Sequence, residues 1–494
     1  MSGPPGHHLW WNDTGCLAPE EKVKPPADGA TNTEWWQYQP ILSRPPTTQH
    51  VMMVLADAVG ELDRPPLDDA SIHTLNLIMA WIRGGFTVHI VSPHRPQCHD
   101  KYPPRLQPVR HERCHYHSVD VVLRQVVPGH LSLGKAWQED RWCEPGFFTT
   151  VVQHLCHAHQ IGVLFLRDSS SSHPQRRYAE PLLRSQLAGA VRVAVCGCNP
   201  FTQGEQRDPD ELVRSYGATP VAVRSASAAS RGWWCPPLVR EAMERPRERP
   251  PKGPYRIVYS GSPHSEFVWW LPRLALAALQ LREQGAALEL WLVFHEKSRT
   301  DAFVTMEQSL RSLPFVKWRV APSLNQRLRI YEEADLGVMV SSSSRLSPQH
   351  HDKVAAAALA PHQRLYPQKD VLRLRQLAAE RMRRLSGEYS VPATLVEMGS
   401  RGLPVLLDRT PAHQQVAGHQ YPLYLADASM RTFREALQRT LQLGGKGGEG
   451  GAGRYAAASA QLLGSVRRDY TIEAQVRRFR ALADDAAANS ASLQ

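Results

Sequence analysis

Short apolar runs alternate with segments of helical periodicity along most of this chain, and this alternation restricts the folds open to it. The apolar runs at 50–55 and 86–91 are separated by a segment at 72–82 whose apolar residues recur with helical spacing. Gly84 and Gly85 end that segment. A strand, a helix, a glycine stop and a second strand form one βαβ unit, whose crossover is right-handed. The pattern therefore predicts an α/β chain with parallel strands covered by helices.

A second series of the same kind follows a charged, proline-rich connector at 244–254. It starts with an apolar strand at 256–260, and further strands are expected at 288–294, 315–320 and 336–340. The chain of 494 residues is long enough for two such series to form separate cores. Two series joined by a linker predict two Rossmann-like doubly wound domains that face each other across a cleft.

The composition shifts along the chain suggest where its domains begin and end. The glycine-rich segment 444–453 lacks the spacing of a phosphate-binding loop and is expected to be a flexible surface loop. The expected divisions are an irregular lead-in at 1–47, an N-terminal domain at 48–243, the linker at 244–254, a C-terminal domain at 255–468 with a helical insertion at 345–385, and a C-terminal helix and tail at 469–494.

The overall composition is that of a globular protein, with 42% hydrophobic and 21% charged residues. No apolar stretch approaches the roughly 18 residues of a membrane helix, and the first residues do not resemble a secretory signal, so a cytoplasmic location is expected. The eight cysteines form no disulfide framework and are expected to be reduced.

The chain carries a net charge of +11, which suits a phosphate-bearing partner such as a nucleotide, a nucleic acid or an anionic membrane surface. Acidic residues flank most of the basic clusters, which favours solvated helix faces over a nucleic-acid surface. No nucleic-acid partner is expected. A peripheral membrane contact through the basic surface is left open.

The most specific motif lies at 389–407, where Leu-Val-Glu-Met at 395–398 is followed by Gly-Leu-Pro-Val at 402–405. This segment resembles the donor-binding signature of retaining GT-B glycosyltransferases, especially those of family 4. Upstream, Tyr-x-x-Ala-Asp at 331–335 is similar to the sequence with which that family enters the preceding strand. The resemblance extends over about residues 50–484, and the last helix is expected to cross back to the first domain.

The resemblance implies a metal-independent glycosyltransferase that retains the anomeric configuration and uses a nucleotide-sugar as substrate, without a cofactor. The acceptor would be a sugar, a lipid or a small molecule bound by the N-terminal domain. Glu397 would accept hydrogen bonds from the ribose hydroxyls, while the start of its helix favours the donor phosphates. The alternative is that Glu397 only complements the helix dipole.

Several positions depart from the family pattern. Tyr389 occupies the place of the first acidic residue of the signature, and Glu388 lies one residue earlier. Gly261 is kept, but Ser262 replaces a phosphate-binding arginine. Arg167 stands where the family often has a sugar-contacting histidine, and an arginine there would steady a departing diphosphate.

Lys297 and Arg299 either supply the missing positive charge or are solvated loop residues. The candidate residues are, for catalysis, Arg167 and Glu388, and for donor binding, Gly261, Ser262, Lys297, Arg299, Tyr389 and Glu397. The same departures leave open a noncatalytic nucleotide-sugar-binding or scaffold protein on a degenerate GT-B fold.

One group of possible metal ligands, His154, Cys156, His157 and His159, lies on a single predicted helix. Only His154 and His157 share a face of it, and no second pair of ligands has a recognisable spacing. The sequence therefore predicts no metal site.

Overall fold

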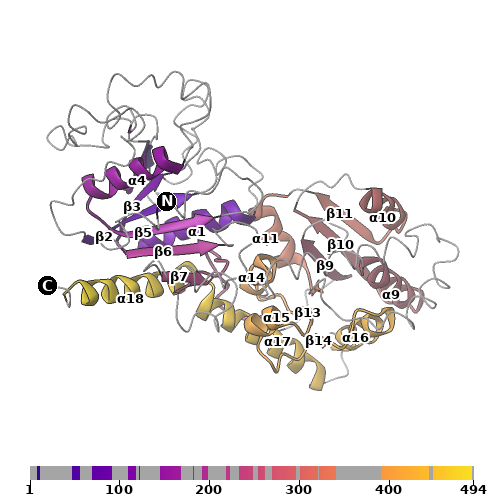
Figure 1. The fold of residues 1–494 in the computed structure, drawn as a ribbon. Helices are drawn as coiled ribbons and strands as arrows, with labels where there is room; N and C mark the ends of the chain where they lie inside the picture. Colours follow the sequence, from indigo (N-terminus) through magenta and orange to yellow (C-terminus); the bar gives the residue numbers. More distant parts are fainter. Residues whose placement is uncertain are drawn as a thin grey trace, which may run out of the picture. The chain divides into compact units, whose positions relative to one another are not determined.

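A computed structural model describes residues 8–11, 47–55, 69–91, 110–117, 122, 145–168, 182, 192–197, 219–222, 233–248, 254–261, 270–295, 301–320, 322–340, 391–443 and 449–491. The chain divides into two compact units, residues 1–235 with 472–494 and residues 236–471. Each unit is built on one sheet of parallel strands with helices packed against it (Figure 1).

The described part of the N-terminal unit contains an eight-stranded sheet in the order β1-β4-β3-β2-β5-β6-β7-β8, and every neighbouring pair is parallel. Residues 51–54 of β2 are fully buried, which explains the apolar run in the sequence. The strands are β1 His8–Trp11, β2 Thr47–Leu55, β3 Thr87–Val91, β4 Arg110–His117, β5 Ile161–Asp168, β6 Arg192–Gly197, β7 Thr219–Ala222 and β8 Trp233–Trp234.

Among the described residues of this unit there are three long helices: α1 Asp69–Arg83, α4 Pro145–Ala158 and α18 Ile472–Ala491. Trp81 of α1 and Phe479 of α18 stack with their ring centroids 3.5 Å apart and their planes 3° from parallel. Trp81 also meets Phe165 of β5 edge-on. The last helix of the chain therefore packs on the first helix of the N-terminal unit, which confirms the expected return of the C-terminal helix.

The C-terminal unit contains a six-stranded sheet in the order β11-β10-β9-β12-β13-β14, again with parallel neighbours among the described strands. Its strands are β9 Tyr255–Gly261, β10 Leu288–Phe294, β11 Val316–Val320, β12 Leu336–Met339, β13 Val405–Asp408 and β14 Tyr424–Leu425.

The helices of the C-terminal unit pack on this sheet and on one another. α9 lies beside α16, where Trp270 at the start of α9 contacts Phe433 with ring centroids 5.7 Å apart (Figure 1). The helices in the described part of this unit are α9 Leu271–Glu283, α10 Asp301–Arg311, α11 Leu324–Glu333, α14 Ala393–Ser400, α15 Pro411–Ala417, α16 Met430–Leu443 and α17 Glu449–Asp469.

The two sheets share one topology. Counted along the chain, the six strands of the C-terminal unit lie in the order 3-2-1-4-5-6 of Rossmann sheets, and β2–β7 repeat this order in the N-terminal unit. The order reverses between β2 and β5 in the first sheet and between β9 and β12 in the second. The predicted pair of doubly wound sheets is therefore confirmed.

Some expected features differ from the structure or lie outside it. The division between the units falls after Cys235, and Arg247 of the predicted connector packs on the C-terminal unit. Its guanidinium donates to the backbone carbonyls of Tyr331 at 2.6 Å, Ala334 at 2.5 Å and Arg401 at 2.9 Å. The predicted insertion at 345–385 and most of the lead-in lie outside the described residues.

The loop predicted at 444–453 is wrong from Glu449 onward, because α17 begins there. Glycine disfavours a helix, but the apolar side of α17 buries Tyr455, Leu462 and Val466, and this packing outweighs the propensity. None of the helices in the described part of the chain combines the length and apolar character needed to cross a lipid bilayer.

Candidate functional site

Glu397 is the residue on which the expected donor site depends, and the structure buries it. It lies in the second turn of α14, which begins after Pro392, and 5% of its surface is exposed. A buried carboxylate in water-poor surroundings needs a compensating positive charge and hydrogen bonds.

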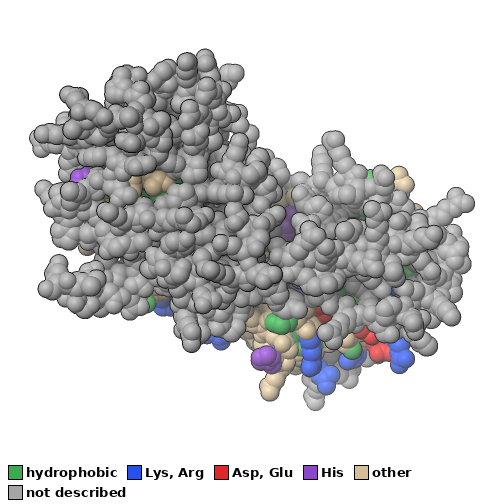
Figure 2. Space-filling model, in the orientation of Figure 1, with side chains coloured by type: hydrophobic (Ala, Val, Ile, Leu, Met, Phe, Trp, Pro, Cys, Tyr) green, Lys and Arg blue, Asp and Glu red, His purple; other side chains and the backbone are tan. Residues whose placement is uncertain are grey.

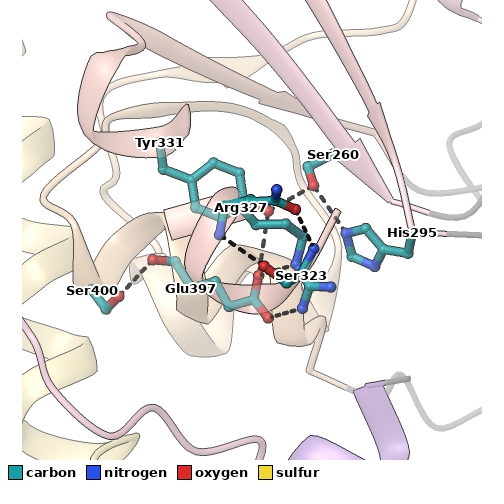
Figure 3. Close-up of polar contacts among 8 residues, drawn as sticks. Ser260, His295, Ser323, Arg327, Tyr331, Glu397 and Ser400 are labelled. Atoms are coloured by element: carbon teal, nitrogen blue, oxygen red, sulfur yellow. Dashed lines mark hydrogen bonds and ion pairs between the residues drawn. The ribbon is translucent and has the colours of Figure 1, made fainter. Parts of the chain in front are cut away.

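Arg327 of α11 supplies both. Its Nη2 donates to Glu397 Oε1 at 2.7 Å and its Nε to Glu397 Oε2 at 3.1 Å, so that the pair is bidentate (Figure 3). The side chains of the two residues are 2% and 6% exposed. Ser323 caps the start of α11 in a reciprocal capping box with Gln326, which fixes the helix that carries Arg327.

A chain of hydrogen bonds extends from this pair to the sheet (Figure 3). The ionised carboxylate of Glu397 can only accept, so the hydroxyl of Tyr331 donates to its Oε2 at 3.3 Å. Because that hydroxyl has a single hydrogen, Ser260 Oγ donates to the Tyr331 oxygen at 2.6 Å. His295 Nε2 then donates to Ser260 Oγ at 2.9 Å, which places the Nε2 hydrogen on this histidine.

The position of this network in the fold agrees with a nucleotide site. Ser260 lies at the carboxyl end of β9, and His295 follows the carboxyl end of β10. Rossmann sheets bind their ligands outside the carboxyl ends of the strands, at the point where the strand order reverses. In this sheet that point lies beside β9, so the network occupies the edge at which a nucleotide would be bound.

The structure gives Gly261 a packing role. It is the last residue of β9, and its carbonyl accepts the backbone N–H of His295 at 3.1 Å. A Cβ at this position would lie 2.8 Å from the hydroxyl of Tyr259, so a larger residue would displace that side chain.

The remaining predicted donor-binding residues, Ser262, Lys297, Arg299 and Tyr389, lie outside the described residues, as does Glu388, which was predicted to be catalytic. In the N-terminal unit, Arg167 is the penultimate residue of β5, paired with Leu55 and Cys196 at the carboxyl end of the sheet. The order of that sheet reverses between β2 and β5, so the backbone of Arg167 lies at its switch point. The side chain of Arg167 also lies outside the described part.

Four members of the network were not predicted as site residues from the sequence: Ser260, His295, Arg327 and Tyr331. Tyr331 was recognised only as part of the Tyr-x-x-Ala-Asp sequence. Arg327 precedes it by four residues, which places both side chains on one face of α11. That spacing is the signal by which Arg327 could have been found.

The aspartate of the same sequence has a structural role at the other end of the sheet. Asp335 Oδ2 accepts the backbone N–H of Arg256 at 2.6 Å, at the start of β9. Burial raises the pKa of Asp335 to about 6, and the Arg256 hydrogen bond and the charge of Arg247 oppose this increase only in part.

The glycine of the Gly-Leu-Pro-Val sequence is required by the backbone. Gly402 has φ 61°, a left-handed conformation that glycine adopts with little strain, at the turn that follows α14. Its carbonyl accepts the hydroxyl of Ser459 at 2.6 Å. The turn leads α14 directly into the buried strand β13.

The charged side chains of the C-terminal unit are mixed in sign. Figure 2 shows Lys and Arg side chains beside Asp and Glu side chains over α16 and α17. On α16, Arg431 pairs with Glu435 at 2.7 Å, one helical turn away. This part of the surface therefore carries charges of both signs rather than a uniformly basic patch.

No protein-family model matches the chain, and no curated protein matches its sequence. Solved structures match it over most of its length. Sucrose-phosphate synthase from Thermosynechococcus elongatus superposes with a TM-score of 0.51 and 13% identity, over 89% of this chain and 100% of that one. TarM has a TM-score of 0.53 and 7% identity, over 88% and 99%. The chain has the GT-B fold.

A third solved structure supports this assignment. Alr3699/HepE from Anabaena, in complex with UDP and glucose, superposes with a TM-score of 0.50 and 10% identity, over 89% of this chain and 100% of that one. At such identities the similarity shows the arrangement of the chain, and function has to be argued from the site.

Proposed function

We propose that this protein is a nucleotide-sugar-dependent glycosyltransferase, metal-independent and retaining, and similar to family 4. The observation that carries the proposal is the buried carboxylate network at the switch point of the second sheet of a GT-B fold. The structure of Alr3699/HepE with UDP and glucose supports a nucleotide-sugar as the donor. The acceptor is a sugar, a lipid or a small molecule.

In this proposal Glu397 accepts hydrogen bonds from the donor ribose, and Arg327 positions its carboxylate by holding both oxygens. The transition state has oxocarbenium character and a departing diphosphate, so fixed positive charge matters more than a strong nucleophile. Arg167, Lys297 and Arg299 supply that charge, and the backbone at Gly261 and Ser262 approaches the phosphates. Glu388 and Tyr389 contact the hydroxyls of the transferred sugar.

The test of the site must separate donor binding from stability, because removing one partner of a buried ion pair costs about 3–5 kcal/mol. We therefore compare Glu397→Gln with the double variant Glu397→Gln/Arg327→Met, which removes both charges together. The double variant is expected to regain most of the stability that the single variant loses. Binding of a panel of nucleoside diphosphates is measured by thermal shift and calorimetry.

The wild type is expected to bind at least one nucleoside diphosphate, and the folded double variant is expected to bind it at least about tenfold more weakly. The matched control is Glu307→Gln/Arg311→Met, which removes an exposed pair on α10. Unchanged affinity in the Glu397 double variant would show that the carboxylate only supports the fold.

One observation favours a second candidate, a noncatalytic nucleotide-sugar-binding or scaffold protein. Both oxygens of Glu397 already accept hydrogen bonds from Arg327, as expected of a carboxylate kept for stability. The two candidates differ in turnover: the scaffold binds a nucleotide-sugar and releases no nucleoside diphosphate from it.

A further inference from the structure

Four histidines lie on one face of the sheet in the N-terminal unit. His89 of β3 is paired in register with His115 of β4, and His117 follows two residues later. His50 of β2 pairs with Thr87, two residues before His89. Because alternate residues of a strand point to the same face, the register places all four imidazoles together.

His159 joins this face from the turn between α4 and β5. Its ring centroid lies 4.5 Å from that of His89 and 5.0 Å from that of His117. The chain reverses here through Gln160, which has the left-handed φ of 51° that few side chains adopt. The turn therefore places the imidazole of His159 beside those of His89 and His117, which belong to the neighbouring strands β3 and β4.

His89, His117 and His159 have the separation of metal ligands. One ring nitrogen of each lies within 4.8 Å of those of the other two, and His89 Nδ1 is 2.9 Å from His117 Nε2. In a tetrahedral zinc site with Zn–N distances of about 2.0–2.1 Å, the ligand nitrogens are about 3.3–3.4 Å apart. The closest pair has to open by about half an ångström and any wider pair to close by at most about 1.5 Å, which rotation of the imidazoles can supply.

Two of the three imidazoles are buried: His89 and His117 are 2% and 4% exposed. Within the described ranges no carboxylate joins the group. His159 is half-buried.

A second contact orients one of the ligands. His50 Nδ1 lies 3.1 Å from His89 Nε2. If His89 binds an ion through Nδ1, its Nε2 hydrogen is donated to His50, and this type of outer hydrogen bond fixes the tautomer of metal-binding histidines.

We propose that His89, His117 and His159 bind a transition-metal ion of the Zn²⁺ type, with the fourth coordination position open to water. The ion links β3, β4 and the turn between α4 and β5, and it stabilises the N-terminal unit. The histidines belong to the N-terminal unit and Glu397 to the C-terminal unit, so the metal proposal does not depend on glycosyl transfer.

The experiment uses the full chain, treated with a chelator and then titrated with Zn²⁺, with Mg²⁺ as the ion that histidines do not favour. At about 100 times the dissociation constant, Zn²⁺ is expected to raise the Tm by about 5 °C or more, and Mg²⁺ to leave it unchanged. Co²⁺ in place of Zn²⁺ is expected to give the intense visible absorption of a four-coordinate ion.

The variants decide which histidines are responsible, since the chain has 22. His117→Gln and His159→Gln are expected to lower Zn²⁺ affinity at least about 100-fold. His159 is half-buried, so its variant should fold even if His117→Gln does not. His115→Gln, on the same face but outside the ligand set, and the exposed His419→Gln are expected to retain the stoichiometry of one tight ion. Tight binding that survives His159→Gln, or wild-type protein that binds Zn²⁺ no more tightly than this variant, would overturn the proposal.

Discussion

Asp335 shows at the scale of one residue how this fold perturbs a charge. Its surface is 1% exposed, and its Oδ2 accepts the backbone N–H of Arg256 at 2.6 Å. Arg247 and Arg256 lie near enough to favour the carboxylate, yet burial dominates and raises the pKa to about 6. The protonated form is therefore favoured in the folded protein relative to the unfolded chain, where the pKa is near 3.8.

The sign of the resulting pH dependence follows from this increase. At a pH below the pKa of the unfolded chain, Asp335 is protonated in both the folded and the unfolded state. As the pH rises through the higher pKa of the folded protein, Asp335 ionises and the folded state loses stability. Asp335→Asn keeps an acceptor for the Arg256 N–H and removes the charge. We expect it to stabilise the protein by about 1–2 kcal/mol near pH 7.5 and by much less near pH 4.5. Urea unfolding at the two pH values measures the difference, and an equal effect at both would contradict the assignment.

The ion pair at Glu397 belongs to the same scale, but its partners are 70 positions apart in the chain. The sequence motif predicted that Glu397 lies on a helix near the donor edge of the sheet. The motif did not indicate that Arg327 would form an ion pair with Glu397, because that contact depends on how α11 and α14 pack on the sheet. The predicted site residues that lie outside the described part of the chain stay predictions.

At the scale of elements, α14 is the short helix on which the site is built, and it is buried along nearly all of its length. Gly399 lies against α17, where an added Cβ would be 2.8 Å from Val466 and 2.9 Å from Leu462. The glycine therefore sets how closely these two helices approach. The left-handed Gly402 then turns the chain into β13.

Two glycine substitutions test this view of the elements. Gly402→Ala places a side chain on a backbone with φ 61° and 3.3 Å from Ser459 Oγ, and is expected to destabilise the protein by about 1–2 kcal/mol. Gly464→Ala, on the exposed side of α17 with nothing within 4 Å, is expected to stabilise it by about 0.5–1 kcal/mol. Equilibrium unfolding measures the change in stability of each variant. If both variants were stabilised, or both destabilised, the helix and turn assignments would be contradicted.

The elements were predictable to different degrees for physical reasons. Buried parallel strands such as β2 and β9 are apolar runs, and their helices have a clear period, so the doubly wound fold follows from the pattern. The histidine cluster did not follow, because His89 and His115 meet only through the register of β3 and β4. The start of α17 was missed because its packing overrides the glycine composition of the segment.

At the scale of the whole molecule, the chain makes two sheets of one topology and then returns to the first unit with its last helix. The return is held by an aromatic cluster in which Phe479 stacks on Trp81 and meets Phe165 edge-on. The N-terminal unit is therefore completed only when the C-terminal end of the chain is in place.

Phe479→Ala tests this dependence. Removal of a fully buried aromatic ring is expected to cost about 3–5 kcal/mol, lost from the N-terminal unit. Hydrogen exchange in α1 should accelerate, whereas α9 and α16 of the other unit keep their protection. Val304→Ala, at an exposed apolar residue of α10, is the control and is expected to change stability by less than about 0.5 kcal/mol. Equal acceleration in both units would show that α18 does not belong to the first unit alone.

Sugar transfer by this GT-B chain is measured as the release of nucleoside diphosphate from a panel of nucleotide-sugars, with wild-type protein beside the folded Glu397→Gln/Arg327→Met variant. We expect release from at least one donor without added metal, reduced at least about tenfold in the variant. A wild-type protein that binds a nucleotide-sugar and releases nothing, with or without acceptors, would contradict the proposal.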